Sequence, residues 1–182
     1  AKALFKGPYT SKFPYQPHKP KERFRGKPEF HSEDCIGCTA CIQVCPCGAL
    51  SYRDYLDTRI LAYKLEFCIF CGQCQSVCPT QKGITLSNKF DLADFCIPKE
   101  EKIEKKLVLC EGCGKVIAPY EQLLWLAKKL GPLCYSNPTL MLFYLKEINL
   151  AELRKTKERD LLRQERIGLL CPYCRRKVVI IS

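Results

Sequence analysis

The alternation of apolar and polar residues predicts short strands in the first half of the chain. Residues 59–66 (RILAYKLE) alternate moderately, which suits a strand with one face buried. Two shorter apolar segments, at residues 49–52 and 83–86, also suit strands. The charged run at residues 99–106 (KEEKIEKK) lacks such a pattern and indicates a solvated linker or the start of a helix.

The second half of the chain carries a helical period. Residues 120–130 (YEQLLWLAKKL) place Leu123, Leu124, Ala127 and Leu130 on one stripe, and a Gly-Pro pair at Gly131 ends the pattern. Asn137 followed by Pro138 is typical of a helix start, which predicts a second helix over residues 139–148. We therefore expect two consecutive helices in this part of the chain.

The last forty residues predict a further helix and a final strand. Residues 150–166 are charged at spacings that allow neighbour pairs along a helix. Residues 177–181 (KVVII) suit a strand. The longest apolar run, residues 140–145 (LMLFYL), is much too short to span a bilayer. Together these segments predict an α+β protein with no membrane span of its own.

Composition adds a strong indication of metal binding. Fifteen of the 182 residues are cysteine, so we expect bound metal to hold part of the fold together. The formal net charge of +11 falls once metal-bound thiolates are counted, because a four-thiolate centre carries a charge of about −2. The cations lie mainly in residues 1–30 and 97–182, which flank a slightly acidic segment at residues 31–96.

Two cysteine runs, residues 35–46 and 68–79, form an internal duplication with a period of 33 residues. Each reads C-x2-C-x2-C-x3-C-P, the spacing of bacterial-type iron–sulfur ligands, in which the fourth cysteine of each run ligates the cluster of the other run. We therefore expect one [4Fe–4S] cluster on Cys35, Cys38, Cys41 and Cys78, and a second on Cys68, Cys71, Cys74 and Cys45.

Two other uses of these cysteines fit the spacing less well. A disulfide framework is not expected in a chain with no visible secretory signal. Zinc sites use pairs of C-x2-C rather than triplets followed by Cys-Pro. Gly37 and Gly72 lie within the runs, where they allow a close approach of the backbone and a positive φ.

A third centre is expected from two further C-x2-C knuckles. Such a pair can enclose one tetrahedral metal ion, and its ligands would be Cys110, Cys113, Cys171 and Cys174. Zinc is our choice because two bare knuckles leave no open position, and rubredoxin-type iron is the alternative with the same ligands. The intervening segment is longer than usual for such a site and is interpreted as a helical insert at about residues 119–166.

The remaining cysteines and both histidines receive the simplest interpretation. Cys47, Cys96 and Cys134 lie outside the ligand spacings and are expected to be buried free thiols, although their roles stay open. His18 and His31 are expected to be solvated, because cysteine fills all eight cluster positions. Nearby cations would raise the reduction potential of a cluster, and we expect Arg53, Lys64 and Lys82 to lie nearest.

The chain thus divides into three predicted parts. Residues 1–30 are rich in Pro, Lys and aromatic residues, which excludes a helix and favours an extended arm. We interpret this arm as a docking segment on a partner, with a flexible basic tail as the alternative. Residues 31–97 form a two-cluster domain with the bacterial-type 2[4Fe–4S] ferredoxin fold. Residues 98–182 form a four-cysteine, zinc-ribbon or rubredoxin-like lobe that carries the insert.

This arrangement resembles a known family. The FRGKPEF segment at residues 24–30, the double cysteine module and the C-terminal knuckles resemble the ferredoxin-type subunit of membrane-bound [NiFe] hydrogenases and formate hydrogenlyase complexes. The two-cluster subunit of respiratory complex I is similar over the arm and the module, but lacks the cysteine pairs corresponding to Cys110/Cys113 and Cys171/Cys174. That difference favours the hydrogenase branch.

The resemblance implies a non-catalytic electron relay. Its partners would be the hydrogenase small and large subunits, other subunits of a membrane-bound complex, and an electron-donor module or ferredoxin. It would lie in the cytoplasm, on the inner face of the cell membrane, held there by those partners. The alternatives are the equivalent subunit of a complex-I-like or sulfur-reducing membrane oxidoreductase, or a free ferredoxin.

Nucleic-acid binding by a basic zinc ribbon is a different class of function. The Lys and Arg residues of segments 154–166 and 175–177 could meet phosphates. A solvated helix face or a subunit contact explains them as well, and no ordered aromatic platform for bases is evident. We therefore expect no nucleic-acid partner.

Overall fold

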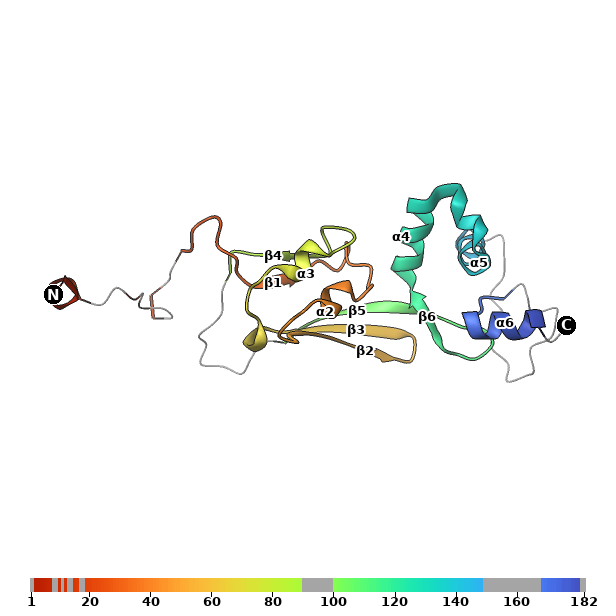
Figure 1. The fold of residues 1–182 in the computed structure, drawn as a ribbon, viewed down its shortest axis with the longest axis horizontal. Coiled ribbons are helices and arrows are strands. Elements are labelled where there is room, and N and C mark those ends of the chain that lie inside the picture. The colour runs from red at the N-terminus through yellow and green to blue at the C-terminus, as the bar shows by residue number, and fades with distance from the viewer. Residues whose placement is uncertain are drawn as a thin grey trace.

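The computed structural model describes residues 2–7, 10, 12, 15–16, 19–89, 100–148 and 168–180. Figure 1 shows an elongated arrangement, with the N-terminal segment at one end, a strand-rich region in the middle and a helical lobe at the other end. Helices and strands are mixed in the described residues, as the α+β prediction requires. Among these residues, no helix combines the length and apolar character needed to cross a membrane.

The duplicated cysteine runs fold around a pair of short strands. β1 (Pro28–Phe30) pairs antiparallel with β4 (Ile84–Leu86), so that Phe30 lies opposite Ile84. Each cysteine run contributes one short helix, α2 (Ala40–Gln43) and α3 (Gln73–Ser76). Strand β4 confirms the predicted strand at residues 83–86. Strand β1 ties the end of the N-terminal arm to the second half of the duplication.

A four-stranded sheet continues from the cluster region into the helical lobe. Its order is β2 (Leu50–Tyr55), β3 (Thr58–Lys64), β5 (Glu100–Leu109) and β6 (Val116–Pro119), and every pair is antiparallel. Strands β2 and β3 confirm the strands predicted near residues 49–52 and 59–66, and η1 (Leu65–Phe67) follows β3. The first seven residues of β5 pair with β3 and its last three with β6.

Strand β5 overturns the prediction of a linker or helix start at residues 99–106. The alternation typical of a strand is present, but charged side chains occupy some of its inward positions. Lys105 is 5% exposed and Leu107 is 3% exposed, whereas Glu104 and Lys106 are exposed. Glu101, on the same face as Lys105, pairs with Lys27 at 2.8 Å. Ion pairs therefore replace the apolar residues that would have revealed the period.

The helical lobe confirms both predicted helices. α4 (Tyr120–Leu130) ends at Gly131, which has a positive φ of 55°, and η2 (Gly131–Ser136) follows. α5 (Pro138–Glu147) begins after Asn137, whose side chain accepts hydrogen bonds from the backbone N–H groups of Thr139 and Leu140. The predicted helix at residues 150–166 lies outside the described residues.

The strand prediction for residues 177–181 is wrong over the described part. The segment continues α6 (Pro172–Ile180), which begins within the second knuckle. Cys174 and Val178, one helical turn apart, are both 3% exposed, whereas Val179 and Ile180 are exposed. The segment therefore follows a helical period that begins at Cys174, and the apolar residues at its end continue the helix and do not form a strand.

The first residues also depart from the prediction. α1 (Lys2–Lys6) is a short helix, although the arm was expected to contain none. These residues precede Pro8, so proline does not restrict them. Leu4 and Phe5 are 89% and 92% exposed. The structure does not test whether the arm docks on a partner.

Three buried clusters make up the core, and cysteines take part in each. One lies between α4, α5 and η2, one lies beneath the duplicated loops, and one surrounds the knuckles. Their buried members are, respectively, Leu123, Ala127, Cys134, Leu140, Leu142, Phe143 and Leu169; Cys41, Leu50, Tyr63, Leu65, Cys74 and Ile84; and Cys110, Leu170, Cys171, Cys174 and Val178.

Candidate iron–sulfur and metal centres

The first pocket gathers four cysteines from both cysteine runs. Three come from the loop that leads into and through α2, and the fourth follows α3. Apolar side chains from β1, β3 and β4 complete its wall, and no charged side chain lines it. The four cysteines are Cys35, Cys38, Cys41 and Cys78. Thiols are therefore the metal-binding groups that this pocket presents, which suits a soft metal centre.

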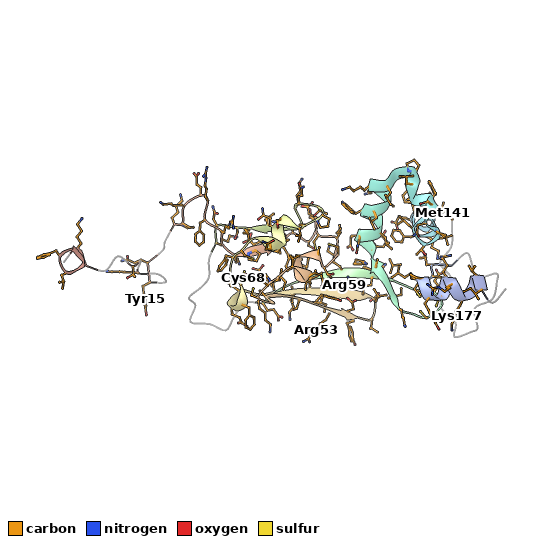
Figure 2. The ribbon with its side chains drawn as sticks, in the orientation of Figure 1. Tyr15, Arg53, Arg59, Cys68, Met141 and Lys177 are labelled. Atoms are coloured by element: carbon orange, nitrogen blue, oxygen red, sulfur yellow. The ribbon has the colours of Figure 1, made fainter. Side chains whose placement is uncertain are left out.

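The second pocket is the counterpart of the first. It is lined by three cysteines of the second run and by the fourth cysteine of the first run, namely Cys68, Cys71, Cys74 and Cys45. It contains one further thiol, because Cys47 also lines it and places its Sγ 3.7 Å from the Sγ of Cys45. In Figure 2, Cys68 lies toward the N-terminal side of the strand-rich region, away from the helical lobe.

Both cysteine loops bend through the left-handed region at matching positions. Gly37 and Thr39 have φ values of 70° and 64° in the first loop, and Phe70 and Gly72 have φ values of 54° and 79° in the second. The positions correspond under the duplication, two and four residues after the first cysteine of each run. Glycine occupies only one of the two positions in each loop, so the other carries the strain of a side chain.

Burial makes thiolates costly in both pockets unless a cation compensates them. Burial, reinforced by neighbouring thiols, raises the pKa of Cys41 to about 12 and that of Cys74 to about 11. Burial also raises the pKa of Cys35 and of Cys68. Such groups become ligands when a metal centre supplies positive charge.

The fourth cysteine of each run has a more polar environment. Burial would raise the pKa of Cys78, but the Thr80 hydroxyl and backbone N–H groups lower it. Burial likewise opposes the lowering of the pKa of Cys45, where backbone N–H groups and the Cys47 thiol outweigh it. Both sulfurs are therefore prepared to carry negative charge.

The knuckles bring four thiols together as the third expected centre. The Sγ atoms of Cys110, Cys113, Cys171 and Cys174 all lie within 4.8 Å of one another. The Sγ atoms of Cys113 and Cys171 are 3.7 Å apart, close to the edge of about 3.8 Å that a tetrahedron with Zn–S bonds of ~2.3 Å requires. The backbone N–H of Cys171 donates to the Sγ of Cys110 at 3.2 Å. This arrangement fits a closed four-thiolate metal ion.

The thiols of this centre differ strongly in acidity. Burial opposes ionisation, yet the backbone N–H of Cys174 and the neighbouring thiols lower the pKa of Cys171 to about 7. Burial and the adjacent thiols raise the pKa of Cys174, and burial raises that of Cys113. One thiolate thus forms readily, whereas four together require a cation.

Comparison with known proteins agrees with iron–sulfur binding by the two cysteine runs. Residues 34–82 match the 4Fe-4S dicluster domain. Formate hydrogenlyase subunit 6 of Escherichia coli is 38% identical over 126 residues, which cover 67% of this chain and 69% of that protein. The chain belongs to the family of iron–sulfur electron-transfer subunits that includes this protein.

Two further proteins match over less of their length. NAD(P)H-quinone oxidoreductase subunit I of Gloeobacter violaceus is 34% identical over 95 residues, and the match spans 48% of this chain and 45% of that protein. A chain of an archaeal membrane-bound sulfane sulfur reductase is 34% identical, with a TM-score of 0.37, covering 49% of this chain and 48% of that chain.

The cations beside the cysteines of this iron–sulfur subunit differ from those expected. Arg53, Lys64 and Lys82 are exposed. The hydrogen bond from Lys102, with the charges of Lys64 and Arg53, lowers the pKa of Glu100. Instead, buried Lys105 of β5 donates to the carbonyl O of Ser32, and its charge counteracts the effect of burial on the pKa of Cys35. Sequence analysis missed this lysine because it lay in a segment interpreted as a solvated linker.

Arg59 is a second cation that sequence analysis missed. Its Nε and Nη2 bind both carboxylate oxygens of Asp54, at 2.7 and 2.8 Å, and its Nη1 donates to the Gly37 carbonyl at 3.1 Å. Its guanidinium also lies 4.8 Å from the centre of the Tyr52 ring. Figure 2 shows that Arg59 lies at the cysteine loops, while Arg53 lies on the outer part of the sheet. No motif marks Arg59, because the contact depends on the pairing of β2 with β3.

A partly buried carboxylate joins the third centre to the helices. Glu111, inside the first knuckle, forms an ion pair with Lys146 of α5 and accepts a hydrogen bond from the backbone N–H of Leu169 at 2.9 Å. The side chains of Glu111 and Lys146 are 13% and 7% exposed. This pair positions the second knuckle against the first across a long insert.

The remaining candidates are placed as follows. Cys134 is 2% exposed and packs in the apolar cluster of the helices, which confirms its assignment as a buried thiol. Cys47 is only partly buried and faces the second pocket. His31 is exposed, and its Nε2 lies 2.8 Å from the Oγ1 of Thr85. Cys96 and His18 lie outside the described residues.

Proposed function

We propose that this chain is a non-catalytic electron relay that holds two [4Fe–4S] clusters. The observation that carries the proposal is the composition of the two pockets, each of which combines three cysteines of one run with the fourth cysteine of the other. This is the crossed arrangement of bacterial-type two-cluster proteins. The clusters would supply one-electron redox chemistry, and the chain would hold them in a shared, mainly apolar shell.

The ligand assignment follows the two pockets. Cys35, Cys38, Cys41 and Cys78 would bind the first cluster, and Cys68, Cys71, Cys74 and Cys45 the second. The shell between them would be the bacterial-type ferredoxin fold proposed for residues 31–97. The Arg59 bond to Gly37 and the Lys105 bond to Ser32 support the loop of the first centre.

The third centre is proposed to be a structural zinc site. Cys110, Cys113, Cys171 and Cys174 leave no position for a substrate, which is typical of closed zinc sites. Rubredoxin-type iron is the alternative, because it takes the same ligands in the same geometry. In either case the metal would join the two ends of the lobe at residues 98–182, and the insert at about residues 119–166 would be held between them.

We further propose that the relay works inside a membrane-bound hydrogenase complex. The match to formate hydrogenlyase subunit 6 is longer than the match to the quinone oxidoreductase subunit. The four knuckle cysteines favour the same branch. The partners would be the hydrogenase small and large subunits, the neighbouring subunits and an electron-donor module or ferredoxin. The arm of residues 1–30 would lie on one of them and hold the chain at the inner face of the membrane.

The equivalent subunit of a complex-I-like or sulfur-reducing oxidoreductase is the second candidate. The similarity to NAD(P)H-quinone oxidoreductase subunit I favours it over the cluster region. Purification of the intact complex with identification of its subunits separates the two candidates. Hydrogenase subunits are expected, and a quinone-reducing or sulfur-reducing set would refute the hydrogenase assignment. Elution of the chain by itself would favour a free ferredoxin.

Metal analysis of the anaerobically prepared chain tests the relay itself. About eight irons per chain and two interacting cubanes in the electron paramagnetic resonance spectrum are expected, together with about one zinc. Cys45→Ser should perturb the same cluster as Cys68→Ser, although the two residues belong to different runs. Cys134→Ala is the matched control and should leave the metal content unchanged. Fewer than about six irons in the unaltered chain would contradict the two-cluster proposal.

A further inference from the structure

The internal duplication allows the two pockets to be compared position by position. Thr80 and Cys47 occupy the same place, two residues after the fourth cysteine of their runs. The Oγ1 of Thr80 lies 3.4 Å from the Sγ of Cys78, and the Sγ of Cys47 lies 3.7 Å from the Sγ of Cys45. The first pocket therefore has a hydroxyl where the second has a thiol.

The surroundings of Thr80 direct its proton toward the sulfur. Its Oγ1 accepts a hydrogen bond from the backbone N–H of Gly83 at 3.0 Å. The hydroxyl hydrogen is then available for the Sγ of Cys78, which accepts as a metal-bound thiolate. A hydroxyl is a full hydrogen-bond donor, whereas a thiol is a weak one. The bond to Cys78 is therefore the stronger of the two.

Backbone N–H groups contribute at both sulfurs. Those of Thr80, Gly83 and Ile84 lower the pKa of Cys78, although the N–H of Gly83 donates to the Oγ1 of Thr80. Those of Cys47, Ala49 and Leu50 lower the pKa of Cys45. The side chain two residues after each cysteine differs in kind between the two pockets, a hydroxyl in the first and a thiol in the second.

Charge adds to the same difference. Lys105 is 5% exposed and acts on Cys35 of the first pocket. Its ion pair with Glu121 is 3.6 Å long, and one carboxylate oxygen of Glu121 is buried, so Glu121 offsets part of this positive charge. At the second pocket, Arg25 donates to the Cys71 carbonyl at 3.4 Å, but this arginine is exposed and its charge is screened by water.

We propose that the centre formed by Cys35, Cys38, Cys41 and Cys78 has the higher reduction potential, and that Thr80 and Lys105 set this difference. The inference rests on the proposed function, because it requires a cluster in each pocket. Hydrogen bonds to ligand sulfurs and nearby positive charge stabilise the negative charge that reduction adds. When the chain receives one electron from dithionite, the first centre is reduced and the second stays oxidised. The electron therefore resides on the side bordered by β5 and α4.

Redox titration of the full chain, followed by electron paramagnetic resonance, tests the proposal. Thr80→Val removes the hydroxyl and should lower the higher reduction potential by ~28 mV. For one electron this corresponds to a change of about threefold in the equilibrium constant. Thr80→Ser keeps the hydroxyl and should leave both potentials unchanged. Cys47→Thr introduces the hydroxyl in the second pocket and should raise the lower potential by a similar amount.

The charge contribution is measured with Lys105→Met, which should also lower the higher potential. Cys47→Thr replaces a weak donor with a stronger one and leaves Thr80 in place, so it keeps the test valid if a Thr80 variant folds poorly. A shift of the lower potential in Thr80→Val, or no shift in both Thr80→Val and Cys47→Thr, would overturn the proposal. If about eight irons are present, such a result overturns the inference about the potentials but not the proposed function. Fewer than about six irons would refute both the inference and the proposed function.

Discussion

At the scale of single residues, the first cysteine loop packs closely because Gly37 has no Cβ. A Cβ placed on Gly37 would lie 3.2 Å from the Cβ and Cγ of Lys105 and from the Cβ of Pro119. Its φ of 70° also disfavours any side chain. Glycine at this position therefore allows the loop to pack directly on β5 and β6.

We predict that Gly37→Ala destabilises the protein more than Gly114→Ala does. Both glycines have a φ of 70°, but nothing lies within 4 Å of a Cβ on Gly114. Gly114→Ala should cost about 1–2 kcal/mol for the backbone conformation. Gly37→Ala should cost about 1–3 kcal/mol more because Lys105 and Pro119 must move. Anaerobic thermal unfolding followed by circular dichroism measures the difference, and equal effects would contradict the close packing.

Spacing alone predicts which cysteines come together. The cysteine runs and the knuckles are read directly from their intervals, and the structure gathers the same cysteines. Lys105, Arg59 and Thr80 could not be found in this way. Each acts on a cysteine loop through strand pairing or a turn, so its position depends on the fold and not on a local motif.

At the scale of elements, the start of α5 is defined by a single side chain. The Oδ1 of Asn137 accepts from the backbone N–H groups of Thr139 and Leu140, at 3.0 and 3.1 Å. The hydroxyl of Thr139 then donates to the carbonyl O of Leu170, next to the second knuckle, at 3.1 Å. The cap therefore positions both the helix and the segment that leads to Cys171.

Asn137→Ala is predicted to lower the free energy of unfolding by about 1 kcal/mol. The alanine has no acceptor for the two N–H groups, whereas Asn137→Asp keeps one and should stay within about 0.5 kcal/mol of the parent. Denaturant unfolding followed by the fluorescence of Trp125, in α4, reports on the lobe. A loss of stability as large in the aspartate variant as in the alanine variant would argue against the capping role.

Elements were predictable where caps and periods agree, as in α4 and α5. The prediction failed at β5 and α6, where long-range contacts override the local pattern. In β5, Glu101 and Lys105 are satisfied by Lys27, Ser32 and Glu121, so that charged residues occupy an inward face. In α6, the second cysteine knuckle starts a helix that continues through residues whose composition suits a strand.

At the scale of the whole molecule, the third centre should stabilise the helical lobe independently of the clusters. Its inner cysteines, Cys113 and Cys171, are separated by 57 residues. A metal bound there would close a long loop and so reduce the freedom of the unfolded chain.

Removal of this metal is predicted to loosen residues 100–148 and 168–180 while the iron–sulfur signals persist. Cys171→Ser should reduce zinc from about one per chain to nearly none and should keep about eight irons. Zinc analysis and hydrogen exchange provide the two readouts. Cys134→Ala is the control, because Cys134 packs among apolar residues and contributes no ligand to the four-thiol group. Loss of iron together with zinc in Cys171→Ser would contradict the independence of the centres.

The strand shared by the two parts of the molecule has a mechanical consequence. β5 is bonded to β3 along its first seven residues and to β6 along its last three, with one irregularity between Val108 and Leu109. Bending the protein at this strand would break main-chain hydrogen bonds, so torque applied to the helices passes along it. Lys105 lies on this strand and donates a hydrogen bond to the carbonyl O of Ser32 in the loop that leads to Cys35. A partner subunit that exerts a force on the helical lobe would therefore strain the loop that borders the first cysteine pocket.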